Sequence, residues 1–267
     1  MDWHFLGWLA VLLYCAAEAL AIAGLWRPRA ASFVAPLLAG GLLLQFADLH
    51  ARAKALGSVP YRTLAGSMTL FGWMLAVAYL ALYVRHRERG IGPFLIPFVV
   101  VFSVAALLIP FEASTPRPET QGSLFALHVT LAILGYAAFA LSFVLSLLYL
   151  VQSRQIRLAR TGLLFARLPS LEAIGRLNRT AVAIGISGLL VSILLGVVWA
   201  RRFWSGLGDA KLLWALFTLL VYGLLLWMDR RGWKGQRVAL LSIIGFGVVI
   251  FSYTFVNMYL SQAHSFR

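Results

Sequence analysis

The side chains with the clearest capacity for chemistry are the histidines, because a neutral imidazole can bind a metal ion and titrates near physiological pH. The chain contains five of them: His4, His50, His86, His128 and His264. All except His86 border apolar segments that, on the charge argument given below, end on one side of a membrane. Four imidazoles on one face predict a ligand site, although each alone is also consistent with an ordinary interfacial residue. His86 lies among arginines and is expected to be a solvated loop residue.

Two carboxyl groups fall within apolar segments. Glu18 lies in the middle of the first segment, where a charge costs about 2.5–3.5 kcal/mol on insertion scales. We therefore expect Glu18 to be neutral, paired or in a polar cavity, with either a functional role or a hydrogen bond to a neighbouring helix. Asp48 lies near the end of the second segment and is expected close to the membrane surface.

A basic and aromatic segment follows the sixth apolar stretch. It contains Arg201, Arg202, Trp204 and Asp209 with several glycines, and Trp214 lies just beyond it. Its rings could cover a flat apolar ligand while its arginines pair with the carboxylates of that ligand. An aromatic belt at the membrane surface explains the same tryptophans without any ligand.

The elements that position these residues are membrane helices. The chain has 267 residues, of which 61% are hydrophobic and 12% charged, with a mean hydropathy of +0.87, and this excludes a single water-soluble core. Its apolar runs are long enough to cross a hydrocarbon layer of ~30 Å. We predict an all-α, polytopic membrane helix bundle that forms one integral membrane domain, 1–267. The eight predicted spans are Trp3–Trp26, Ser32–Leu49, Leu64–Val84, Pro93–Pro110, Leu124–Val151, Thr180–Ala200, Lys211–Met228 and Val238–Leu260.

The distribution of charge predicts the topology. A net charge of +14 would suggest nucleic acid in a soluble protein, but here the basic residues lie in loops between spans, so we expect a lipid bilayer and no nucleic acid. Fifteen of the 23 Lys and Arg fall in the loops on one side, which predicts that both termini lie outside. The longest loop, 152–178, is predicted to be a cytoplasmic amphipathic segment of two interfacial helices broken at Pro169, with Ser170 as an N-cap.

The order of several short motifs resembles that of the cytochrome c assembly family, the membrane haem handlers of the CcsA/CcmC type. The motifs extend over about half of the chain and are Leu127-His128-Val129, Leu134-Gly135-Tyr136, Leu168-Pro169-Ser170-Leu171-Glu172, Gly196-Val197-Val198-Trp199-Ala200, Trp214-Ala215-Leu216, Arg231-Gly232-Trp233-Lys234-Gly235 and Val256-Asn257 running to His264-Ser265.

This resemblance implies a reversibly bound haem b. His128 and His264 match the two outer-face axial ligands of the haem iron in that family. Trp204, Asp209 and Trp214 match the frame of its WxWD haem-cover loop, with Arg201 and Arg202 beside them. Both tryptophans of the WxWD motif are gone, so 201–210 is predicted to be a degenerate form of the loop.

A second departure concerns the membrane-embedded haem of the synthase branch. Its two histidines would fall at Ser58 and Trp227, and both are replaced. His50, two turns before Ser58, is retained as a candidate haem-binding residue. The pattern is more similar to the HemX-like inner-membrane branch than to the full synthase. This resemblance implies that the membrane is the inner (plasma) membrane.

We therefore expect a protein that binds and handles haem at the outer face, in cytochrome c assembly or haem trafficking, and is not an enzyme. No nucleophile–base pair, phosphate-binding loop or metal quartet is visible in the sequence, and the single Cys15 excludes an internal disulfide. The expected partners are haem and, as a candidate, a second membrane subunit of cytochrome c maturation. The alternatives are a membrane regulator or scaffold of a tetrapyrrole-pathway enzyme or transporter, and a proton-coupled solute carrier that uses Glu18.

Overall fold

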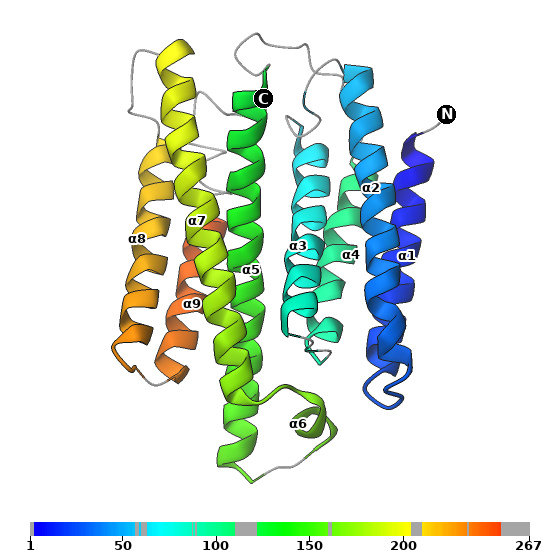
Figure 1. Ribbon diagram of the computed structural model, residues 1–267, viewed down its shortest axis with the longest axis vertical. Coiled ribbons are helices and arrows are strands. Elements are labelled where there is room, and N and C mark those ends of the chain that lie inside the picture. Colours follow the sequence, from blue (N-terminus) through cyan, green and yellow to red (C-terminus); the bar gives the residue numbers. More distant parts are fainter. Residues whose placement is uncertain are drawn as a thin grey trace. The chain divides into compact units, whose positions relative to one another are not determined.

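A computed structural model describes most of the chain as helices (Figure 1). The residues described are 3–56, 59, 63–86, 88, 90–109, 122–159, 162–203, 210–233 and 235–251, and among them there is no strand. The chain divides into two compact units. The first comprises Met1–Pro116 and Arg154–Ala173, and the second comprises Arg117–Ser153 and Ile174–Arg267. Each unit is described by itself.

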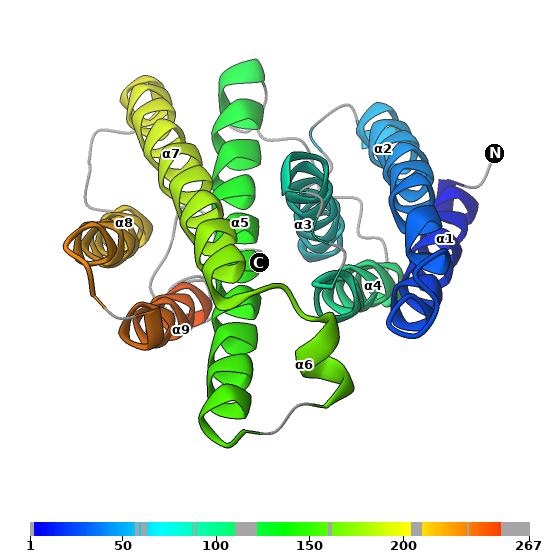
Figure 2. The same ribbon diagram turned by 60° about the horizontal axis from the view of Figure 1, so that its bottom comes forward.

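The first unit is built on four long helices. They are α1 (Trp3–Ala23), α2 (Val34–Leu56, preceded by the 3-10 turn η1, Ala30–Phe33), α3 (Leu64–His86) and α4 (Gly92–Leu108). Helix α1 packs against α2 and α4, and α3 packs against α2 and α4 (Figure 2). The short helix α6 (Leu163–Arg167) also belongs to this unit.

A buried polar cluster joins the four long helices of the first unit. The hydroxyl of Tyr14 in α1 donates to Oε1 of Gln45 in α2 at 2.7 Å. Nε2 of Gln45 donates in turn to Oγ of Ser103 in α4 at 3.2 Å and to the carbonyl of Thr69 in α3 at 3.3 Å. Because an unpaired amide is costly in an apolar medium, these bonds favour the one arrangement that satisfies all of them.

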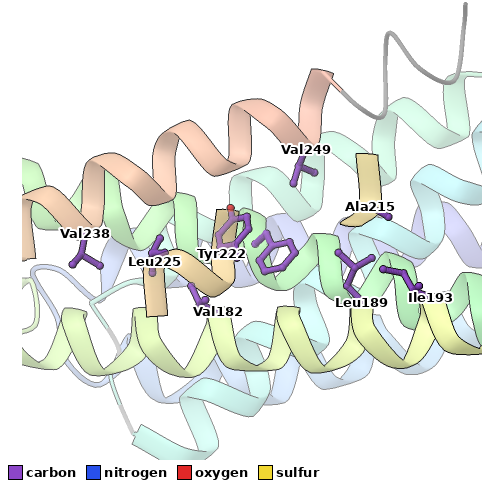
Figure 3. Packing of buried hydrophobic residues seen from close by; sticks show 9 residues of the cluster. Val182, Leu189, Ile193, Ala215, Tyr222, Leu225, Val238 and Val249 are labelled. Atoms are coloured by element: carbon purple, nitrogen blue, oxygen red, sulfur yellow. The ribbon is translucent and has the colours of Figure 1, made fainter. Parts of the chain in front are cut away.

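The second unit contains most of α5 (Ser123–Arg157), most of α7 (Leu171–Phe203), α8 (Ala210–Arg230) and α9 (Gly235–Phe251). Its core includes an apolar cluster around Tyr222 (Figure 3). The ring of Phe139 stacks on that of Tyr222, with 3.7 Å between the ring centroids. The other buried members of the cluster are Val182, Leu189, Ile193, Ala215, Leu225, Val238 and Val249.

A second polar cluster joins all four helices of this unit. Oγ of Ser142 in α5 donates to Oδ1 of Asn178 in α7 at 2.5 Å and lies 2.6 Å from Oγ of Ser242 in α9. Since the Ser142 proton is used on Asn178, Ser242 is the donor in the second bond. The hydroxyl of Tyr222 in α8 donates to the carbonyl of Ser242 at 3.4 Å.

Each of the eight predicted spans overlaps a helix in the described part of the chain, and residues 252–260 of the last span lie outside the described residues. Six of these helices are long and apolar enough to cross a membrane, namely α1, α2 with η1, α3, α5, α7 and α8. The apolar stretches of α4 and α9, Gly92–Leu108 and Gly235–Ile250, are shorter. The protein is therefore a multi-pass membrane protein, whereas the count of eight spans and the sides of the termini stay predictions.

The basic segment after the fifth span differs from the predicted one. Of the two interfacial helices expected, the first is the five-residue α6, and the second is instead the start of α7, which runs without a break from Leu171. The apolar side chains of Ile174 and Leu177 are buried while the charged side chains around them are exposed, so these turns extend the membrane helix. Ser170 caps it as predicted, accepting from the amide of Ala173 at 3.2 Å.

Candidate functional site

The imidazole of His128 is fixed by hydrogen bonds between two helices. His128 lies near the start of α5, and its Nδ1 is 2.7 Å from the carbonyl oxygen of Ser192 in α7. Because a carbonyl oxygen only accepts, Nδ1 carries the ring proton. Oγ of Ser192 lies 3.1 Å from the same Nδ1 and donates to the carbonyl of His128 at 2.8 Å. The lone pair of the neutral ring is therefore on Nε2, which is the form that binds a metal ion.

One face of α7 is shaped to receive this ring. A Cβ atom at Gly196 would lie 2.7 Å from Cε1 of His128, so a larger residue there would displace the imidazole. The indole of Trp199, 4% exposed, lies nearly parallel to the imidazole, with 6.5 Å between centroids and 7° between planes. The ring of Phe125 packs in turn against the indole of Trp199, with 5.3 Å between their centroids. Ser192, Gly196 and Trp199 follow one another at the spacing of a single helix face.

Glycines bring α5 and α7 close enough for these contacts. A Cβ atom at Gly135 would lie 3.1 Å from the carbonyl oxygen of Gly185, and one at Gly188 would lie 3.2 Å from that of Leu131. The two antiparallel backbones are thus nearly in contact along this stretch, as small residues allow in membrane helices. This approach fixes the register in which His128 meets Ser192.

The other candidate residues of the second unit lie partly within the described chain. Helix α5 begins, α7 ends, α8 begins and α9 ends at the same end of the unit (Figure 1). Arg201 and Arg202 occupy the last turn of α7, and Trp214 is half-buried near the start of α8 with its ring edge-on to Phe217, at 5.6 Å between centroids. These positions share the end that carries His128. Trp204, Asp209 and His264 lie outside the described residues.

The structure describes His50 and one of the two replaced histidine positions. His50 is an exposed residue of α2 in the first unit, and its ring stacks on that of Phe46 with 6.4 Å between centroids. Trp227 is 53% exposed on α8, and Ser58 lies outside the described residues. The described part of the chain holds no group of three or more His, Cys, Asp or Glu that could bind a metal ion. A haem iron needs only axial ligands from the protein.

The structure describes three polar residues of the first unit that the sequence singled out, and it corrects the expectation for His86. Asp48 is buried within the protein, 1% exposed, and forms an ion pair at 2.9 Å with Arg52, itself 3% exposed, one turn further along α2; its depth relative to the membrane surface stays a prediction. His86 is not a solvated loop residue but the last residue of α3, and its Nε2 is buried with no hydrogen-bond partner among the described residues. Glu18 is half-buried, and its Oε2 has no hydrogen-bond partner within the described chain. Whether this carboxyl group is neutral, paired through its other oxygen or in a polar cavity stays a prediction.

Sequence reasoning missed the residues that hold His128. Gly196 and Trp199 were identified only as members of a sequence motif, and Ser192 was not singled out as a site residue. The available signal was their spacing of four and then three residues, which places all three on one helix face. It gave no indication that the partner on the other helix would be a histidine.

The sequence is similar to those of several known proteins. Residues 61–264 match the model of the family described as Cytochrome C assembly protein. The chain is similar to the cytochrome c biogenesis protein CcsA of Pyropia yezoensis, with 28% identity over 260 residues and 82% of each chain covered. It is also similar to two proteins named HemX, from Brevibacillus brevis (33% identity, covering 73% of this chain and 74% of the relative) and Bacillus subtilis strain 168 (30% identity, 79% and 78%). The matched range includes His128 and His264 and excludes Glu18, Asp48 and His50.

Proposed function

The chain belongs to the cytochrome c assembly protein family, and from this premise we propose that it binds haem b reversibly at the outer face of the inner membrane during cytochrome c assembly. His128 and His264 are the axial ligands of the iron in this proposal. In this proposal haem is a ligand that the protein binds and later releases, not a permanent cofactor. The CcsA relatives, which are named for cytochrome c biogenesis, support the assembly role.

The observation that carries the proposal is the hydrogen bond from Nδ1 of His128 to the Ser192 carbonyl, 2.7 Å long. Histidines that bind metals almost always donate their second ring N–H to a fixed acceptor, which selects the tautomer and orients the ring. The geometry at His128 therefore fits a ligand of iron.

The surrounding residues have separate roles in this proposal. Trp199 and Phe125 support the imidazole from the protein side. Arg201 and Arg202, at the end of α7, pair with the propionates of haem, because guanidinium groups bind carboxylates through two parallel N–H bonds. Trp214 covers one edge of the porphyrin. When bound, haem supplies the iron, and the chain only binds, orients and releases it. No catalytic step is assigned.

The test is the haem content of variants purified from cells that overproduce haem. We expect His128→Gly and His264→Gly each to lose most bound haem, measured as the Soret absorbance per protein, and to regain it when imidazole is added to fill the cavity. His86→Gly, which changes a histidine of the first unit, should retain the wild-type content. If both variants keep their haem, or if the wild type binds none, the axial assignment is wrong and the regulator or scaffold alternative replaces it.

A further inference from the structure

Two arginine–tryptophan pairs flank the turn between α8 and α9. The guanidinium carbon of Arg231 lies over the ring of Trp227, 5.0 Å from its centroid, and that of Arg237 lies over Trp233 at 5.3 Å. Both tryptophans are exposed, 53% for Trp227 and 39% for Trp233, and both arginines are exposed as well. An aromatic face holds a guanidinium group in place without neutralising its charge.

The elements on either side of the turn have defined backbone geometry. The amides of Gly232 and Trp233 donate to the carbonyls of Asp229 and Met228 at 3.0 and 3.2 Å, which is the Schellman pattern that ends a helix. Gly232 has φ +79°, a conformation that favours glycine. A Cβ atom at Gly235 would overlap the ring of Tyr149 in α5, so α9 begins tightly against that helix. One pair therefore lies at the capped end of α8, and Arg237 of the other pair lies at the start of α9, which packs against α5.

Charge around the turn is strongly positive. The segment 227–237 contains four basic residues and one acidic residue, Asp229. That carboxylate is engaged by Arg179 of α7, with 3.3 Å between Nη1 and Oδ2. Among the described residues neither Arg231 nor Arg237 has an acidic side chain within ion-pair distance. Their charge is therefore available to an anion from outside the protein.

We propose that this turn is a binding site for the headgroup phosphate of an anionic phospholipid. The turn joins two apolar helices, α8 and α9 (Figure 1), so it lies where the chain leaves the hydrocarbon and phosphate groups are concentrated. Exposed indole rings are favoured at that depth, which favours a lipid over a free anion. Guanidinium groups bind phosphate through paired N–H bonds, and the two arginines present this chemistry on either side of the turn. The site is independent of haem.

The experiment measures lipid binding to the full-length protein in detergent by native mass spectrometry, with phosphatidylglycerol and phosphatidylcholine in competition. We expect the wild type to retain phosphatidylglycerol preferentially. Arg231→Gln with Arg237→Gln should weaken that binding about 30-fold, as expected for two basic residues near an anionic surface. Trp227→Leu with Trp233→Leu leaves every charge in place and should weaken it about tenfold.

The matched control is Arg154→Gln with Arg157→Gln, which removes two exposed arginines for which the described residues provide no aromatic ring. It should change the affinity less than about threefold. Equal losses in the two arginine pairs would overturn the proposal, because they would indicate diffuse attraction. Unchanged binding in the Arg231 and Arg237 pair would also overturn it, as would full displacement of the lipid by inorganic phosphate.

Discussion

At the scale of single residues, a backbone carbonyl on a neighbouring helix determines which nitrogen of His128 can bind a metal. The carbonyl of Ser192 fixes the proton on Nδ1, and Gly196 leaves room for the ring. His128 itself could be identified from the sequence through a motif, whereas these two supports could not. A carbonyl has no sequence signature, and glycine is common wherever membrane helices approach each other.

Gly196→Ala tests this support. The added methyl group would lie 2.7 Å from the imidazole and must push the ring away. We expect the bound haem to lose one axial ligand, so that its absorption spectrum changes from six-coordinate low-spin to five-coordinate high-spin, with protein yield unchanged. Gly223→Ala in α8, where a Cβ atom meets nothing within 4 Å, is the matched control. A wild-type spectrum for Gly196→Ala would show that His128 does not hold the iron in this position.

At the scale of elements, polar residues inside helices explain why predicted helix ends were displaced. The second span was predicted to stop at Leu49, whereas α2 continues to Leu56 and includes Arg52 and Lys54. Asp48 and Arg52 lie one turn apart and pair, so each compensates the charge of the other inside the helix. Side chains that meet across helices, such as Ser142 with Asn178 and Ser242, also fix the packing. Their register depends on three segments that lie far apart in the sequence.

Ser142→Ala should destabilise the second unit. The change leaves Oδ1 of Asn178 and Oγ of Ser242 without the hydroxyl that they share, which costs about 1 kcal/mol and up to ~2 kcal/mol in membrane helices. The measurement is the free energy of unfolding in mixed micelles titrated with dodecyl sulfate. Ser187→Ala, an exposed serine on α7, is the control and should be neutral. Equal stability of the two variants would contradict the role of Ser142 as a link between helices.

At the scale of the whole molecule, the sequence predicted a helical membrane protein more securely than it predicted how that protein is oriented in the membrane. The apolar blocks identify helices reliably because each must satisfy its backbone hydrogen bonds within lipid. The charge rule that predicts orientation treats every arginine as a loop residue, and Arg52 is a buried helix residue instead. If Arg52 is not counted among the basic loop residues of the outer side, the difference in Lys and Arg between the two sides of the membrane becomes larger. The arginines around α6 are still counted on the predicted cytoplasmic side.

Topology is tested by a reporter fused after Arg160. The charge distribution places this position in the cytoplasm, so a fluorescent protein fused there should fluoresce and alkaline phosphatase should be inactive. The same reporters fused within 112–123 should give the opposite result. Alkaline phosphatase activity after Arg160 would reverse the orientation, and with it the proposed outer location of His128.

The central claim is that two imidazoles hold haem iron on this protein. The most direct measurement is the electron paramagnetic resonance spectrum of the ferric wild-type protein purified from cells that overproduce haem. Two neutral imidazole ligands give a low-spin signal, and this is the result that we predict, with the signal lost in His128→Gly. A high-spin signal in the wild type, or a purified protein without haem, would contradict the account.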